Sequence, residues 1–154
     1  MPHVLEPFSE YLLIKHQCGL DNLEKVRSEY ESRNIEAEVL EFFNNPEEQI
    51  KWSDFVVSRA GALSLSEITS MKKGALMIPL PNSIDNHQYE NAKKIEDMGM
   101  GILHEEDEDI SYLTDKLNEI IKDKKYINWK KNELTNHLNA ANEIVKHIEE
   151  YLDK

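Results

Sequence analysis

The chain has 154 residues, of which 40 % are hydrophobic and 31 % are charged, and this balance indicates one soluble domain with one hydrophobic core. Its formal net charge of -12 argues against a nucleic-acid surface, because phosphate backbones are bound by clustered Lys and Arg. The charge does not exclude one phosphorylated small molecule, which backbone N–H groups can bind. Cys18 is the single cysteine, so no disulfide within the chain is possible and a reducing compartment fits.

The first half of the chain alternates short apolar runs with helical patterns. Strands are expected at 11–17, 35–43 and 54–61, the last of which ends in a turn that contains Gly61. Asp21 is a candidate N-cap for the first helix, with Glu24 three residues later as in a capping box. The pair Asn45-Pro46 predicts the start of a second helix.

The second half continues the alternation. Helices are expected at 64–71 and 86–99, and strands at 74–81 and 101–104. The acidic run 105–109 is interpreted as a solvated loop and helix start rather than as a metal site. Two apolar stripes then predict helices with buried faces, one of Ile110, Leu113, Leu117, Ile120 and Ile121 and one of Leu134, Leu138, Ala141, Val145, Ile148 and Leu152.

Alternating strands and helices predict an α/β fold, with a parallel sheet and helices on both faces. In such sheets ligands bind beyond the carboxyl ends of the strands. The polar turns that follow the strands at 54–61 and 74–81 should therefore lie on the ligand side.

The first of these turns is "RAGALSLSE", 59–67. Gly61 allows a tight turn, and Ser64 is expected to begin a helix whose N–H groups attract a phosphate. Glu67, in the expected first turn, could accept two hydrogen bonds from a vicinal diol such as ribose. The alternative is a capping box in which Ser64 and Glu67 satisfy each other's backbone donors.

The second turn is "PLPNSIDNHQYENA", 79–92. It gathers five polar side chains that could hydrogen-bond a sugar: Asp85, Asn86, His87, Gln88 and Asn91. The alternative is a loop in which Asn and Asp serve only as turn and cap residues. No triad, zinc motif, P-loop or G-x-G-x-x-G pattern accompanies them.

Together, "SDFVVSRAGALSLSEI" and "MIPLPNSIDNHQYENA" closely resemble the C-terminal domain of glycosyltransferase family 28, and the resemblance extends through "IKHQCG" and "EVLEFF" into the last helix. The resemblance is to those members that transfer N-acetylglucosamine from UDP-GlcNAc to an undecaprenyl-linked acceptor, and it implies the donor-binding half of an enzyme that forms lipid II in peptidoglycan synthesis. They have the GT-B architecture, in which two Rossmann-like domains face each other across a cleft and the C-terminal one holds the donor.

The resemblance implies a set of UDP-GlcNAc contacts. Phe43 would offer its backbone to uracil, Arg59 would lie near the donor, Glu67 would hold the ribose hydroxyls, and Gln88 would read the sugar, with His87 beside it. The other implied contacts are Ala62, Leu63, Ser64, Leu65 and Ser66, near the diphosphate, and Asp85 and Asn91. The resemblance implies neither a metal ion at the diphosphate nor another cofactor.

The chain also departs from the family pattern. The family domain begins with a strand and a Gly-rich loop, G-G-S-x-G-A, whereas "MPHVLEPFSEY" matches the end of the helix that follows them. A smaller departure is "MKKGAL", where the family has Gly and Pro at the positions of Lys72 and Gly74. We expect residues 1–154 to form a single UDP-sugar-binding domain, truncated at its N-terminal edge, with an exposed sheet edge and low stability on its own.

The expected partners are UDP-GlcNAc and an acceptor-binding domain or companion chain, which would bring the undecaprenyl-linked acceptor and the catalytic base. The N-terminal sequence has no signal peptide and no apolar run is long enough for a membrane span, so we expect a cytoplasmic protein, peripheral at the inner membrane only through that partner. Two alternatives stay open: a non-catalytic UDP-sugar-binding remnant, and the donor subunit of another lipid or metabolite glycosyltransferase.

Overall fold

The computed structural model describes residues 1–81, 83 and 86–129. In chain order the elements are α1 (Pro2–Leu5), the 3-10 helix η1 (Glu6–Tyr11), β1 (Ile14–Gln17), α2 (Leu23–Glu31), β2 (Ala37–Leu40), α3 (Pro46–Trp52), β3 (Val56–Ser58), α4 (Ala62–Ser70), β4 (Ala75–Met77), α5 (His87–Asp97), β5 (Gly101–Leu103), α6 (Ile110–Ile121) and α7 (Tyr126–Trp129).

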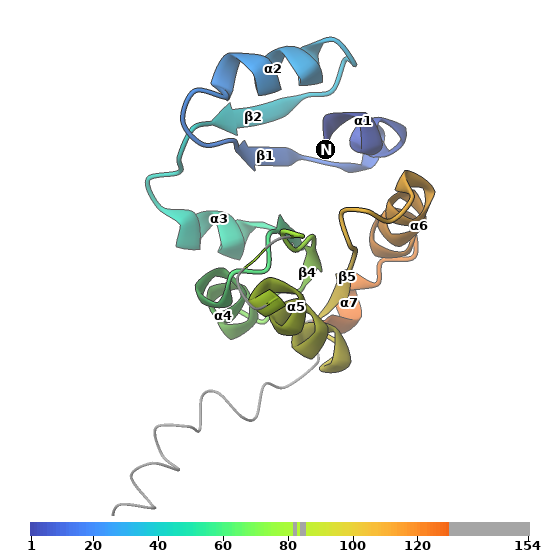
Figure 1. Cartoon of the computed structure of the whole chain (residues 1–154). Helices are drawn as coiled ribbons and strands as arrows, with labels where there is room; N and C mark the ends of the chain where they lie inside the picture. Colours follow the sequence, from blue (N-terminus) through green and yellow to red (C-terminus); the bar gives the residue numbers. More distant parts are fainter. Residues whose placement is uncertain (82, 84–85, 130–154) are drawn as a thin grey trace, which may run out of the picture.

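All strand pairs of the described residues are parallel, which confirms the α/β class. The hydrogen bonds form two sheets, one of order β1-β2 and one of order β3-β4-β5. Figure 1 shows β1 and β2 together, apart from the three-stranded sheet, with α3 connecting them. The sequence predicted one continuous parallel sheet, whereas the described strands form two separate hydrogen-bonded sheets.

One face of the three-stranded sheet is covered by α4 and α5. Their apolar side chains, among them Leu65, Ile68 and Ile95, pack against Ala75, Met77 and Leu103 of the strands. Ile50 of α3 packs against the edge of the same cluster.

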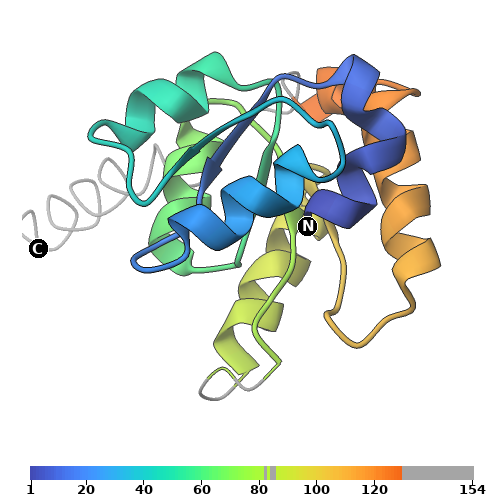
Figure 2. The same ribbon diagram turned by 90° about the horizontal axis from the view of Figure 1, so that it is seen from above.

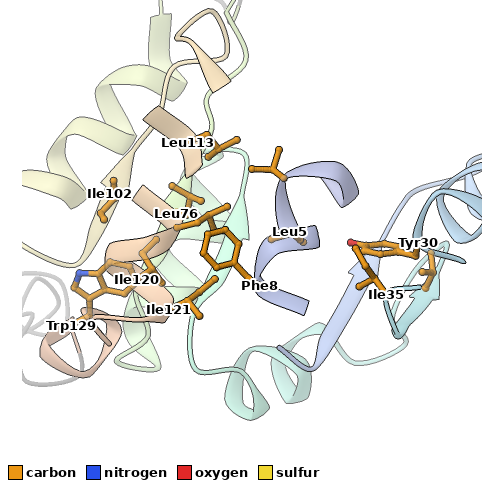
Figure 3. Packing of buried hydrophobic residues seen from close by; sticks show 13 residues of the cluster. Leu5, Phe8, Tyr30, Ile35, Leu76, Ile102, Leu113, Ile120, Ile121 and Trp129 are labelled. Carbon is orange, nitrogen blue, oxygen red and sulfur yellow. The ribbon is translucent and has the colours of Figure 1, made fainter. Parts of the chain in front are cut away.

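The other face carries a core that reaches both sheets. Tyr30, Ile35 and Val39 come from the α2–β2 unit, and Leu76, Ile102 and the buried residues of α6 come from the second unit. Phe8 of η1, only 1 % exposed, belongs to the same cluster with Val4 and Leu5. The N-terminal segment lies beside α6, as Figures 2 and 3 show.

The predicted boundaries are confirmed for some elements and corrected for others. Asn45 and Pro46 take the N-cap and first positions of α3, as predicted. The N-cap of α2 is Asn22 rather than Asp21, which has a left-handed backbone (φ 62°) and lies one residue before the cap. Helix α4 begins two residues before the predicted Ser64, since Gly61 is its N-cap.

The C-terminus of α4 explains the departure at "MKKGAL". Lys72 takes the left-handed conformation (φ 55°), its N–H donates to the carbonyl of Thr69 at 2.9 Å, and the N–H of Lys73 donates to that of Ile68 at 3.1 Å. This is a Schellman motif with lysine where glycine is favoured. Helix α5 closes in the same way with Gly99 (φ 66°).

Replacing Lys72 with glycine is expected to stabilise the protein by about 1 kcal/mol, because glycine adopts the left-handed conformation without a steric cost. Urea unfolding of both chains measures the difference. The control is Lys94→Gly in α5, where glycine in a helix should cost about 1 kcal/mol instead. Equal loss of stability in both variants would contradict the assignment of strain to Lys72.

In the described part of the chain, no helix is both long and apolar enough to cross a membrane. Of the two predicted stripes, the first forms α6, in which Leu113, Leu117, Ile120 and Ile121 are buried and Ile110 is exposed. The second stripe lies outside the described residues.

Candidate functional site

The N-terminus of α4 lies directly after β3, at the carboxyl edge of the second sheet. Gly61 makes no side-chain cap, and the first hydrogen bond of the helix is donated by Leu65 to the Gly61 carbonyl at 3.0 Å. The N–H groups of Ala62, Leu63 and Ser64 precede that bond and remain available to a ligand. The positive end of the helix dipole favours an anion there.

Because α4 begins earlier than predicted, Ser64 and Glu67 lie further along the helix than the sequence indicated. Ser64 is the third residue of the helix, so it is not a cap, and Glu67 lies in the second turn instead of the first. The alternative of a Ser64–Glu67 capping box is therefore wrong. Glu67 is exposed, and in the described part of the chain no hydrogen bond or ion pair engages its carboxylate.

Two side chains of α5 hold the neighbouring loops. Asn91 donates from Nδ2 to the carbonyl of Ala60 at 3.2 Å, which ties α5 to the turn before α4. Gln88 accepts from the N–H of Leu80 at 3.0 Å, which ties α5 to the segment after β4. The two amides thus attach α5 to two different segments, the turn before α4 and the chain after β4.

Arg59 follows β3 and is engaged on two sides. It donates to the carbonyl of Ile78 at 3.2 Å and forms a two-point ion pair with Glu106, at 2.8 and 3.3 Å. The hydrogen bond from Arg59 lowers the pKa of Glu106 below its usual range. Sequence reasoning missed Glu106, because nothing in an acidic run indicates which carboxylate meets an arginine 47 residues earlier.

Phe43 follows β2, on the first sheet. Its backbone N–H donates to Oε1 of Gln17 at 3.0 Å, which joins the carboxyl ends of β1 and β2. The carbonyl of Phe43 is therefore the backbone group left to meet a base, unless Gln17 moves.

The remaining residues predicted to contact the ligand differ in whether their side chains are exposed. Leu65 is 3 % exposed and packs in the core, so only its backbone could meet a ligand, whereas Leu63 is 75 % exposed. Ser66 and His87 are exposed on α4 and α5. Asp85 lies outside the described residues.

The acidic run 105–109 is a loop and helix start, as predicted. Asp109 caps α6 through the N–H of Ser111 at 2.8 Å. Glu108 contacts Nδ1 of the buried His104 at 2.7 Å and Nζ of Lys116 at 2.6 Å. Among the described residues no group of His, Cys, Asp and Glu is arranged to hold a metal ion.

Two histidines make stability depend on pH. Burial is the main cause that lowers the pKa of His16 and of His104, assisted at His104 by the charge of Lys116. The unfolded chain therefore binds more protons than the folded one once the pH falls below the usual histidine value of 6.5.

The contribution of the two histidines to the free energy of unfolding is thus expected to be full above pH 6.5 and to decrease as the pH falls below it. Urea unfolding at pH 7.5 and at pH 5.5 measures this. His16→Asn, which keeps a polar group beside the Tyr30 hydroxyl, should show a smaller decrease. A constant free energy of unfolding across this range would contradict the prediction.

The arrangement is that of an α/β domain whose candidate ligand site lies at the carboxyl ends of its strands, around a helix N-terminus. The model of the glycosyltransferase family 28 C-terminal domain matches residues 3–149. The chain belongs to this family.

The relatives extend the comparison. The chain is 42 % identical over 118 residues to the UDP-N-acetylglucosamine–N-acetylmuramyl-(pentapeptide) pyrophosphoryl-undecaprenol N-acetylglucosamine transferase of Rickettsia bellii, covering 75 % of this chain and 33 % of the relative. It is 43 % identical over 97 residues to the enzyme of the same name from Wolbachia pipientis, covering 63 % and 28 %. The chain thus spans about a third of the length of these relatives.

A solved structure shares the fold. The crystal structure of Acinetobacter baumannii MurG matches with a TM-score of 0.78 at 24 % identity, covering 97 % of this chain and 44 % of that one. Both sheets are included in this match, so their relative placement is that found in a longer protein of the same fold.

Proposed function

We propose that this chain is the donor-binding part of a MurG-like N-acetylglucosaminyltransferase and binds UDP-GlcNAc. The observation that carries the proposal is the uncapped N-terminus of α4 at the sheet edge, with the exposed carboxylate of Glu67 on the same helix. Family membership and the names of the relatives support this choice of ligand.

Each part of the donor has a matching group. The diphosphate would accept from the N–H groups that open α4, and the ribose hydroxyls would donate to Glu67. The carbonyl of Phe43 would accept from the uracil ring, and the amides of Gln88 and Asn91 would meet the sugar hydroxyls. The residues offered are thus hydrogen-bonding groups, which suits a ligand rich in hydroxyls and phosphate oxygens.

The proposed reaction is an inverting displacement at the anomeric carbon of the sugar. As the bond to the diphosphate breaks, negative charge grows on the leaving UDP, and the helix N-terminus stabilises that charge. An undecaprenyl-linked acceptor, giving lipid II, would be activated by a base on another domain or chain. That partner would also bring this domain to the cytoplasmic face of the membrane.

Calorimetric titration with UDP-GlcNAc, with UDP-glucose as control, tests the donor assignment. Binding that prefers UDP-GlcNAc is the expected result. A folded chain that binds neither nucleotide sugar, nor UDP, would contradict the proposal that residues 1–154 hold the donor.

Glu106→Gln tests the role of Arg59. The carboxylate of Glu106 competes with a diphosphate for the guanidinium, so its neutral isostere should raise the affinity for UDP about two- to fivefold, as expected for the loss of an exposed ion pair. The control is Glu105→Gln, one residue earlier in the same loop. A lower UDP affinity in Glu106→Gln alone would mean that Glu106 holds Arg59 in its binding position.

A further inference from the structure

The loop between β5 and α6 is short and is fixed at both ends. At its start, the N–H of His104 donates to the carbonyl of Met77 in β4 at 2.9 Å. At its end, Asp109 caps α6 by accepting from the N–H of Ser111 at 2.8 Å. Residues 105–108 therefore connect two points that the sheet and the helix hold in place.

The carboxylate of Glu108 closes these residues into a turn. The N–H of Glu108 donates to the carbonyl of Glu105 at 3.1 Å, and the N–H of Glu105 donates to Oε2 of Glu108, also at 3.1 Å. The first bond is that of a β-turn, and the second is a side-chain bond across the same turn. Glu106 and Asp107 are its two central residues, so the conformation of the turn decides where their side chains point.

Two further groups fix the carboxylate of Glu108. Nζ of Lys116 in α6 donates to the same Oε2 at 2.6 Å, and Nδ1 of His104 lies 2.7 Å from it. The side chain of His104 is 4 % exposed and that of Lys116 is 21 % exposed, so packing restricts both. Burial acts to raise the pKa of Glu108, but the hydrogen bond from Lys116 and its charge outweigh this and keep the pKa below its usual value. The carboxylate is therefore ionised at neutral pH and accepts at this position.

The side chain of Glu106 connects this turn to the candidate site. Glu106 accepts from Nη1 and Nη2 of Arg59 at 2.8 and 3.3 Å, and Arg59 also donates to the carbonyl of Ile78. Arg59 follows β3, Ile78 follows β4 and Glu106 follows β5, so the loops after three neighbouring strands meet at one guanidinium. An exposed ion pair is weak by itself, and its population therefore depends on how well the turn presents Glu106.

We propose that Glu108 is a positioning residue of the donor site: it closes the turn that holds Glu106 against Arg59, and so sets how readily the guanidinium can turn to a diphosphate. Without this carboxylate the turn keeps only its backbone hydrogen bond, and Glu106 loses its fixed direction. The inference rests on the proposed function for what Arg59 binds, whereas the coupling of Glu108 to Arg59 depends only on the fold.

Glu108→Ala tests the coupling without any ligand. In the parent chain the hydrogen bond from Arg59 keeps the pKa of Glu106 below its usual range. When the turn opens, the pKa of Glu106 should rise toward the usual value, which an NMR titration of the glutamate carboxyl carbons measures. Loss of the negative charge at position 108 would by itself lower the pKa of Glu106, so a rise reports a weaker contact with Arg59.

Asp107→Ala is the matched control for charge. It removes an equal charge from the same turn, and among the described residues no hydrogen bond or ion pair engages Asp107, so the pKa of Glu106 should not rise. Glu108→Gln keeps one oxygen that can accept from the N–H of Glu105, and it should give a smaller rise than Glu108→Ala. Urea unfolding shows that each variant is folded, and Glu108→Gln carries the test if the alanine variant is not.

UDP affinity tests the connection to the donor site. Glu108→Ala should change the affinity in the same direction as Glu106→Gln, with an increase of about two- to fivefold. It should add nothing in the double variant with Glu106→Gln, because the ion pair through which it acts is already absent. Calorimetric titration with UDP of the parent chain, both single variants and the double variant measures this.

Three outcomes would overturn the inference. The first is a pKa of Glu106 that falls or stays constant in both Glu108 variants. The second is a rise of that pKa with no change in UDP affinity, and the third is an effect of Glu108→Ala on UDP affinity that is as large with Glu106→Gln as without it. A parent chain that binds no UDP would instead contradict the proposed function, and the titration of Glu106, which needs no ligand, distinguishes the two failures.

Discussion

Replacing Glu67 with alanine is expected to weaken UDP binding by about 10- to 100-fold, because hydrogen bonds to a charged group contribute about 1.5–3 kcal/mol. The carboxylate is exposed, lies in the second turn of α4 and is engaged by no other described group. The fold should not be affected, since an exposed helical substitution usually changes stability by less than about 0.5 kcal/mol. Calorimetric titration with UDP measures the affinity, and urea unfolding measures the stability.

One variant separates hydrogen-bond acceptance by Glu67 from its negative charge, and a second, on another helix, is the control. Glu67→Gln keeps one acceptor oxygen and should retain part of the affinity. Glu31→Ala removes an exposed glutamate from α2, in the other sheet unit, and should leave UDP binding unchanged. UDP affinity that is the same in the parent chain and in Glu67→Ala would exclude the ribose assignment.

Gly74→Ala is expected to have the largest effect on stability, a loss of about 3 kcal/mol. A Cβ atom at position 74 would overlap the ring of Trp129 and lie 2.7 Å from the carbonyl oxygen of Met100. Trp129 is 2 % exposed in the main core, and the carbonyl belongs to the backbone, so neither neighbour can move away easily. Thermal and urea unfolding of the variant measure the loss.

Gly61→Ala is the matched control, because a Cβ atom there has no neighbour within 4 Å; its stability should change by less than about 1 kcal/mol. The double variant Gly74→Ala with Trp129→Phe should lose less than the sum of the two single losses, since the smaller ring relieves the overlap. Additive losses would show that the ring is not the group that opposes the methyl.

The elements could be predicted from the sequence more reliably than their ends. The alternation of apolar runs and helical spacing identified every described helix from α2 to α6 and all five strands. The start of α4 was misplaced because Ser64 and Glu67 have the spacing of a capping box, while the backbone turns into the helix at Gly61. Local residue types set a propensity, but the path of the chain out of β3 decides where the helix begins.

At the candidate site, likewise, the residues could be predicted from the sequence but their hydrogen-bond partners could not. The motifs indicated that Arg59, Gln88 and Asn91 would gather at one edge, and the structure brings them to adjoining loops. Their partners could not be predicted, because contacts such as that between Arg59 and Glu106 depend on how separate loops pack. The division into two sheets could not be predicted from the strand patterns either. Such patterns indicate which face of a strand is buried, but not which strands become neighbours.

The N-terminal segment Pro2–Tyr11 has a consequence for how the molecule unfolds. It packs on a cluster that includes residues of both sheets, and within the described part of the chain no strand pairing joins those sheets. Cooperativity between the two halves therefore depends on whether Phe8 and its neighbours stay docked. If they detach, the β1–β2 unit and the β3–β5 unit become separate unfolding units, and a single melting transition would divide into two.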